Sequence, residues 1–219
     1  MSLPEAAVAR VPAGRLRLTA PWWGLALALA AGSAAVQVSL WTDLSALRDA
    51  LDWQRALLGA QPWRWWSAAF PHLDTTHLAA NLAGCAVVAA FGLAAGLGRG
   101  AALAWLLAWP LTHLTLALAP GVERYAGLSG VLHAGVATGA VFVIVDKCPG
   151  VMRWIGVAVA AGLLAKLVQE QAWVAPVQRL AGWDFPVVVA AHAAGALAGT
   201  GCALAVLGWR RCSRPTMPA

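Results

Sequence analysis

A serine and a histidine lie in separate apolar segments of this sequence. Ser129 follows Gly127-Leu128 near the start of one segment, and His192 lies about six residues into another. A serine hydroxyl is a weak nucleophile until a neighbouring base takes its proton, and a neutral histidine can be that base. The two residues therefore indicate nucleophilic catalysis, provided that the fold brings them together.

Donors for a developing oxyanion are present as well. His77 and Asn81 are four residues apart, so their side chains share one face of a helix. The backbone N–H groups of Leu128 and Ser129, at the expected start of a helix, are further candidates. These groups complete the minimum set that acyl transfer by a serine requires.

The sequence places no carboxylate at the depth of this serine. Asp146 and Glu170 lie at the ends of their apolar segments. We expect Glu170 and Gln171 to serve structure, with a role for the outer Glu170 near the substrate entrance left open. The expected arrangement is a Ser–His dyad, without the carboxylate of a triad. His133, four residues after Ser129, is open: it can stack near His192, hydrogen-bond or only pack.

Composition assigns these groups to a membrane protein. The chain has 219 residues, of which 61% are hydrophobic and 11% charged, and its mean hydropathy is +0.70. Soluble domains carry about 25% charged residues. The net charge of +6 does not indicate nucleic acid, because the basic residues flank apolar runs and form no patch. We predict an all-α polytopic membrane protein.

Six apolar runs are long enough to cross a bilayer as helices. The predicted domain covers residues 21–209, between an N-terminal segment, 1–20, and a tail, 210–219. An interfacial segment, about 42–66, follows the first span. The six spans are about 22–41, 76–97, 101–119, 127–145, 151–173 and 186–209.

The distribution of basic residues predicts the orientation. With both termini inside, the inner segments hold nine of the 15 Lys and Arg residues and two acids. This asymmetry favours cytoplasmic termini. The second, fourth and sixth spans then begin at the outer face. The nine inner basic residues are Arg10, Arg15, Arg17, Arg99, Lys147, Arg153, Arg210, Arg211 and Arg214.

Glycine pairs predict how these spans pack. Gly135 and Gly139 lie in the fourth span, and Gly195 and Gly199 in the sixth. Small residues at this spacing let helix backbones approach closely. We expect the fourth span to pack on the sixth through both pairs, and Gly127 to leave backbone room for a substrate.

Taken together, these motifs resemble the rhomboid intramembrane serine proteases. The matching residues are His72-x4-His77-x3-Asn81, Gly127-Leu128-Ser129-Gly130 and Ala191-His192-Ala193-Ala194-Gly195, with Trp63-Arg64 ahead of the second span. The resemblance covers nearly the whole chain and implies a six-helix rhomboid-like bundle.

The resemblance implies roles for these residues. Ser129 would be the nucleophile and His192 its base, with His77 and Asn81 as oxyanion donors and His72 in support. Many rhomboids have a tyrosine where this chain has His133. That difference, with Lys166-x3-Glu170-Gln171, is more similar to the rhombosortase subgroup.

The subgroup implies a substrate and a location. Its members cleave single-span, membrane-anchored proteins with a C-terminal Gly-Gly, an apolar helix and a basic tail. They lie in the bacterial inner membrane with the active site open to the periplasm. No cofactor, metal or nucleic acid is expected; the bilayer is the other partner.

Two alternatives remain. One is a catalytically inactive rhomboid-like protein that binds or escorts client transmembrane helices, although such proteins typically lose the serine or histidine. The other is a metal hydrolase with His72, His77, His133 and His192 as ligands. It lacks acidic ligands at depth and a His-Glu-x-x-His motif.

Overall fold

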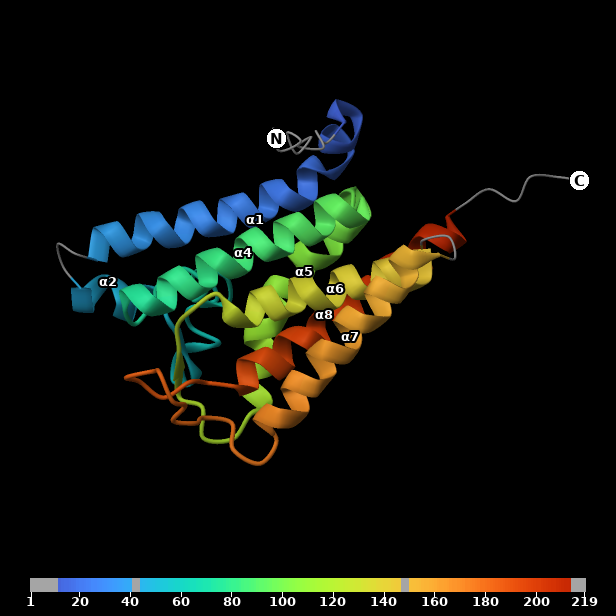
Figure 1. Cartoon of the computed structure of the whole chain (residues 1–219). Coiled ribbons are helices and arrows are strands. Elements are labelled where there is room, and N and C mark those ends of the chain that lie inside the picture. Colours follow the sequence, from blue (N-terminus) through green and yellow to red (C-terminus); the bar gives the residue numbers. More distant parts are fainter. Residues whose placement is uncertain (1–11, 41–43, 147–149, 214–219) are drawn as a thin grey trace, which may run out of the picture.

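A computed structural model describes residues 12–40, 44–146 and 150–213. Within these ranges six helices are long and apolar enough to cross a membrane. The prediction of an all-α polytopic membrane protein is therefore confirmed (Figure 1). The six helices are α1 (Ala13–Leu40), α4 (Thr75–Ala95), α5 (Arg99–Thr115), α6 (Ser129–Asp146), α7 (Val151–Glu170) and α8 (Ala190–Cys212).

The helix boundaries differ in detail from the predicted spans. Helix α1 begins at Ala13, well before the predicted start at 22, so Pro21 lies inside it and part of the predicted 1–20 segment is helical. Helix α8 begins at Ala190 and reaches Cys212, shifted along from the predicted 186–209. Residues 1–11 and 214–219 of the two predicted terminal segments lie outside the described residues.

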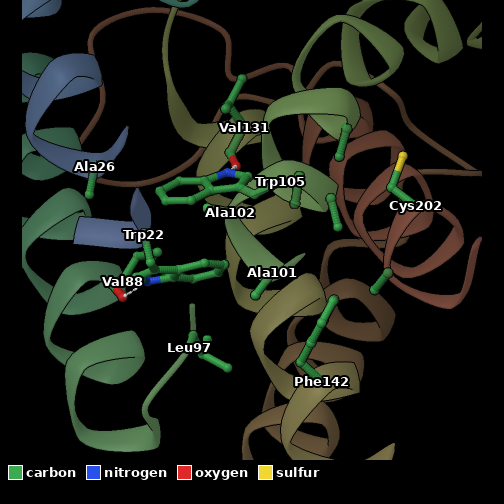
Figure 2. Close-up of a cluster of buried hydrophobic side chains, with 14 of the residues drawn as sticks. Trp22, Ala26, Val88, Leu97, Ala101, Ala102, Trp105, Val131, Phe142 and Cys202 are labelled. Atoms are coloured by element: carbon green, nitrogen blue, oxygen red, sulfur yellow. Dashed lines mark hydrogen bonds between the residues drawn. The ribbon is translucent and has the colours of Figure 1, made fainter. Parts of the chain in front are cut away.

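Two tryptophans fix the centre of the bundle. Trp22 of α1 donates from Nε1 to the Val88 carbonyl of α4 at 2.8 Å, and Trp105 of α5 donates to the Val131 carbonyl of α6 at 2.8 Å (Figure 2). Their ring centroids are 4.8 Å apart. Because no water is available inside a bilayer, each buried indole N–H needs such a partner. The pair ties α1, α4, α5 and α6 together.

Close packing of α6 on α8 depends on the glycines of α8. A Cβ at Gly195 would lie 1.9 Å from the Gly130 carbonyl oxygen, and one at Gly199 would lie 2.3 Å from that of Ala134. The prediction that Gly195 and Gly199 pack closely on α6 is therefore confirmed. The other half of the predicted contact is wrong, because Gly135 faces Trp105 of α5 and Gly139 faces Phe91 of α4. The small α6 residues opposite α8 are Gly130 and Ala134.

The segment between α1 and α4 is a small, tightly connected structure. It contains α2 (Leu44–Leu51), β1 (Trp53–Gln54), the 3₁₀ turn η1 (Arg55–Leu57) and α3 (Arg64–Ser67). Strand β1 pairs antiparallel with β2 (Arg124–Tyr125), which lies four residues before Ser129 in the chain. A second 3₁₀ turn, η2 (Leu116–Leu118), follows α5. The β1–β2 pairing therefore fixes the path of the chain segment that precedes α6.

Helix α7 is the peripheral helix of the bundle. Among its residues only Gly156 and Glu170 are buried, and its main neighbour is α6. Gly156 packs on Val143 at one end of the helix. At the other end the helix buries Glu170, and a glutamate is an unusual residue to bury.

Candidate functional site

Ser129, His192 and Glu170 form a hydrogen-bonded series. Ser129 Oγ lies 3.0 Å from His192 Nε2, and His192 Nδ1 lies 2.9 and 3.0 Å from the two carboxylate oxygens of Glu170. A carboxylate can only accept, so Nδ1 donates to it and Nε2 is left to accept from the Ser129 hydroxyl. This is the geometry of a serine activated by an oriented histidine.

The expectation of a dyad without a carboxylate is therefore wrong in its geometry. Glu170 is the last residue of α7 and is buried against His192, while Lys166, one turn earlier, donates to it at 2.6 Å. The sequence contained one usable signal: the fifth span ends at the same membrane face where the sixth begins. Topology therefore places an acid at that end on the same membrane face as His192, and the packing of α7 brings the two into contact.

Three helix ends bring these groups together. Ser129 is the first residue of α6, His192 lies in the first turn of α8, and Glu170 ends α7. The first N–H groups of a helix lack intrahelical acceptors and carry partial positive charge. Ser129 thus lies at a helix end that can stabilise negative charge.

His133 stacks directly on the candidate base. The rings of His133 and His192 are 4.1 Å apart between centroids and 13° from parallel. His133 Nδ1 also donates to the Ser129 carbonyl at 2.7 Å. Two of the three options left open by the sequence therefore hold together, and the stack fixes the plane of His192.

Sequence reasoning missed Tyr125, the only tyrosine of the chain. Its hydroxyl lies 3.5 Å from Ser129 Oγ and accepts a hydrogen bond from the Gly130 N–H at 3.2 Å. Burial raises the pKa of the phenol, so the group stays protonated. The β1–β2 pairing, which includes Trp53 opposite Tyr125, places it beside the serine.

The predicted oxyanion donors lie at the same place. His77 Nδ1 accepts from the Leu73 N–H at 3.4 Å, which leaves the ring proton on Nε2 as a donor. Asn81 donates one N–H to the His77 carbonyl at 3.0 Å, and its amide carries a second. Both side chains border a cavity that also contains Ser129 and His192.

His72 contacts the ring of His77. It does not border either of the two cavities next to Ser129. The two rings meet edge to face with centroids 4.8 Å apart, and His72 Nδ1 donates to the Phe70 carbonyl at 2.9 Å. Burial lowers the His72 pKa from 6.5 to about 4, so the ring is neutral. His72 supports the ring of His77.

Of the remaining predicted positions, Gly127 differs from expectation, and the predicted role of the Leu128 backbone stays a prediction. The Leu128 side chain is fully buried in the core, so only its backbone can contribute to the site. Gly127 has a φ of 131°, and a Cβ there would lie 2.6 Å from His77 Cε1. The space beside Gly127 therefore holds the His77 ring, and the prediction that it holds substrate is wrong for this conformation.

Two cavities meet at Ser129, and both are bordered by His77, Phe185 and Val187. The first, the apolar cavity, has a volume of about 570 Å³ and is formed by α4, α6, α7 and the loop 171–189. The second, the charged cavity, has about 310 Å³ and is bordered by α2 and β2. Its charged residues are Arg48, Asp49, Asp52 and Arg124.

Metal ligation has no matching geometry in the described part of the chain, where no three His, Cys, Asp or Glu side chains converge as ligands would. The histidines of the metal alternative form two ring pairs, His72–His77 and His133–His192.

Comparison with protein-family models and with curated proteins finds no match to this chain.

Proposed function

We propose that the protein is an intramembrane serine peptidase in which Ser129 is the nucleophile and His192 the general base. The observation that carries the proposal is the 3.0 Å contact between Ser129 Oγ and His192 Nε2, with Glu170 on the opposite ring nitrogen. These groups border a cavity between apolar helices. This arrangement supports acyl transfer by Ser129.

The proposed reaction has two steps. His192 takes the hydroxyl proton as Ser129 attacks the scissile carbonyl, and His77, Asn81 and the first N–H groups of α6 stabilise the oxyanion. The protonated His192 then gives its proton to the leaving amine. Water, or another acceptor nucleophile, releases the acyl-enzyme by the reverse proton transfers. Glu170 accepts from Nδ1 throughout.

The two cavities support a membrane-anchored substrate. Part of the substrate's transmembrane segment would enter the apolar cavity, which faces Val87, Leu163 and Leu132 from three helices. Backbone that leaves the membrane fits the charged cavity. The scissile bond then lies at the boundary, where the two cavities meet beside Ser129.

The resemblance to rhomboid proteases, and to their rhombosortase subgroup, extends the proposal. It adds substrates with a C-terminal Gly-Gly, apolar helix and basic tail, a bacterial inner-membrane location and a site open to the periplasm. The excess of basic residues in the inner segments supports cytoplasmic termini.

The test is cleavage of a Gly-Gly, single-span substrate by the purified protein in liposomes. We expect cleavage by the wild type and none by Ser129→Ala or His192→Ala that remain folded. Binding of the substrate without cleavage by the wild type would favour the helix-binding alternative. Cleavage by Ser129→Ala would contradict the proposed nucleophile.

A further inference from the structure

The charged cavity contains two carboxylates, and both are already paired. Arg124 binds Asp49 and also Asp52, the latter at 2.7 Å. Arg64 donates to the same Asp52 at 3.1 Å and is itself buried. Arg124 has a raised pKa because of its hydrogen bonds to the two aspartates. Neither carboxylate needs a further cation.

Among the described residues, Arg48 is the charged residue of this cavity that lacks a partner. Its side chain is half-buried, and its Nε is buried without any hydrogen-bond acceptor. Among the described residues no carboxylate lies within salt-bridge distance of it. Among the described residues, the two aspartates of the cavity pair with Arg64 and Arg124, and neither pairs with Arg48.

The backbone that carries Arg48 is held in place. Helix α2 ends in four carbonyls, at residues 48–51, that lack intrahelical donors. Each one accepts a hydrogen bond: from the Asp52 N–H at 2.9 Å, and from the side chains of Gln54, Trp63 and Ser67 at 3.0, 3.2 and 2.7 Å. A fully satisfied helix end indicates a fixed position for Arg48.

An unpaired guanidinium on a fixed helix is typical of a binding group. Buried donors in native proteins are almost always satisfied, and a charged donor without a partner costs more than a neutral one. A ligand that brings an acceptor into the cavity gives this guanidinium a partner. Carboxylates match the guanidinium best, because both groups are planar and bond in pairs.

We propose that Arg48 selects an acidic side chain, Asp or Glu, in the part of the substrate that enters the charged cavity. The inference rests on the proposed function, since it assumes that a substrate is cleaved at Ser129. A peptide whose carbonyl lies at Ser129 continues into this cavity, because Ser129 borders it. Its acidic side chain then pairs with Arg48, while Asp49 and Asp52 stay bound to Arg124.

The experiment uses the full chain in liposomes and a matched series of substrates. Each substrate is a single transmembrane helix preceded by a polar segment with a quenched fluorophore pair. It carries Glu, Gln or Lys at one position near the scissile bond, which mass spectrometry of the products locates. Each position of the polar segment is varied in turn, and kcat/KM is measured for every member.

We expect one position at which the wild type prefers Glu over Gln by about fivefold, the size of a partly exposed ion pair. Arg48→Lys should keep the preference for Glu. Arg48→Gln should remove it, and Arg48→Glu should reverse it in favour of Lys. Arg179→Gln is the control, since it removes an exposed cation that borders neither cavity. If Arg48→Glu does not fold, Arg48→Gln and Arg48→Lys decide the question.

Equal cleavage of the Glu, Gln and Lys substrates by the wild type at every position would overturn the role of Arg48. So would a preference for Glu that survives in Arg48→Gln. Both results leave the serine peptidase proposal intact. Failure of that proposal has a different signature, because then no substrate is cleaved in a manner that depends on Ser129.

Discussion

The Glu170 carboxylate lies 2.9 Å from Nδ1 of His192, on the opposite side of the ring from Ser129. The two residues are 22 positions apart and come from different helices. Because α7 buries little else, this contact is the main polar attachment of its site end to the bundle. The series from Lys166 through Glu170 to His192 thus extends from α7 to the nucleophile.

Glu170→Gln tests this relationship. The amide cannot hold the tautomer and charge of His192 as a carboxylate does, so kcat should fall by about 10² to 10⁴-fold while KM changes little. Glu123→Gln, which removes an exposed acid at the same end of the bundle, should leave kcat unchanged. An unchanged kcat in folded Glu170→Gln would show that the carboxylate has no role in orienting the histidine.

The position of the Glu170 carboxylate was not predicted from the sequence. Residue type, spacing and hydropathy were enough for six helices and for Ser129, His77, Asn81 and His192 at one end. They did not place Glu170, because burial of an acid at a span end depends on how α7 packs. Tyr125 was missed for a similar reason: its position follows from strand pairing with Trp53, a contact between residues far apart in the sequence.

The packing of the helices was also predicted only in part from the sequence. The spacing of Gly195 and Gly199 predicted that they make close helix contacts, since small residues four positions apart lie on the same face of a helix. It did not identify their partner, because both faces of α6 carry small residues. Gly135 and Gly139 receive large side chains from α5 and α4, Trp105 and Phe91, and which helix lies opposite is a property of the whole bundle.

Gly195→Ala tests the packing of α6 on α8. Its Cβ would overlap the Gly130 carbonyl, and backbone cannot move aside as a side chain can. We expect a loss of about 3 kcal/mol, which corresponds to a drop of roughly 10 °C in Tm for a chain of this size. Gly208→Ala, on the same helix, meets nothing within 4 Å and should leave Tm unchanged or slightly higher. Thermal unfolding in detergent compares the two, and equal Tm values would refute the close contact.

His133 offers a test of the ring stack. His133→Ala removes a ring that lies parallel to His192 at 4.1 Å, and kcat/KM should fall by about tenfold, the value of a stacked pair. His133→Phe keeps a ring at this position and should retain most of the activity. If the two variants were equally impaired, the hydrogen bond from His133 to the Ser129 carbonyl would matter more than the stack.

Acid should destabilise the protein through His72. Its pKa is about 4 in the fold and 6.5 when unfolded, because burial favours the neutral ring. Unfolding therefore takes up a proton between these values, so this contribution is complete above pH 6.5 and is lost as the pH falls toward 4. The loss is about 3 kcal/mol at 1.36 kcal/mol per pKa unit.

His72→Asn isolates this effect. Asparagine keeps an N–H for the Phe70 carbonyl but does not titrate in this range. Thermal unfolding from pH 7 to pH 4 should show a steeper fall in Tm for the wild type than for the variant. Parallel curves would mean that the ring is charged or solvated in the folded protein.

Covalent labelling tests the central claim most directly. A fluorophosphonate reacts only with a serine that a base has activated, so the wild type should gain one adduct, which tandem mass spectrometry places on Ser129. His192→Ala should slow the labelling by at least about 10³-fold, and Ser213→Ala should label at the wild-type rate. Absence of an adduct from folded wild type, or an undiminished adduct in Ser129→Ala, would contradict the assignment of Ser129 as an activated nucleophile.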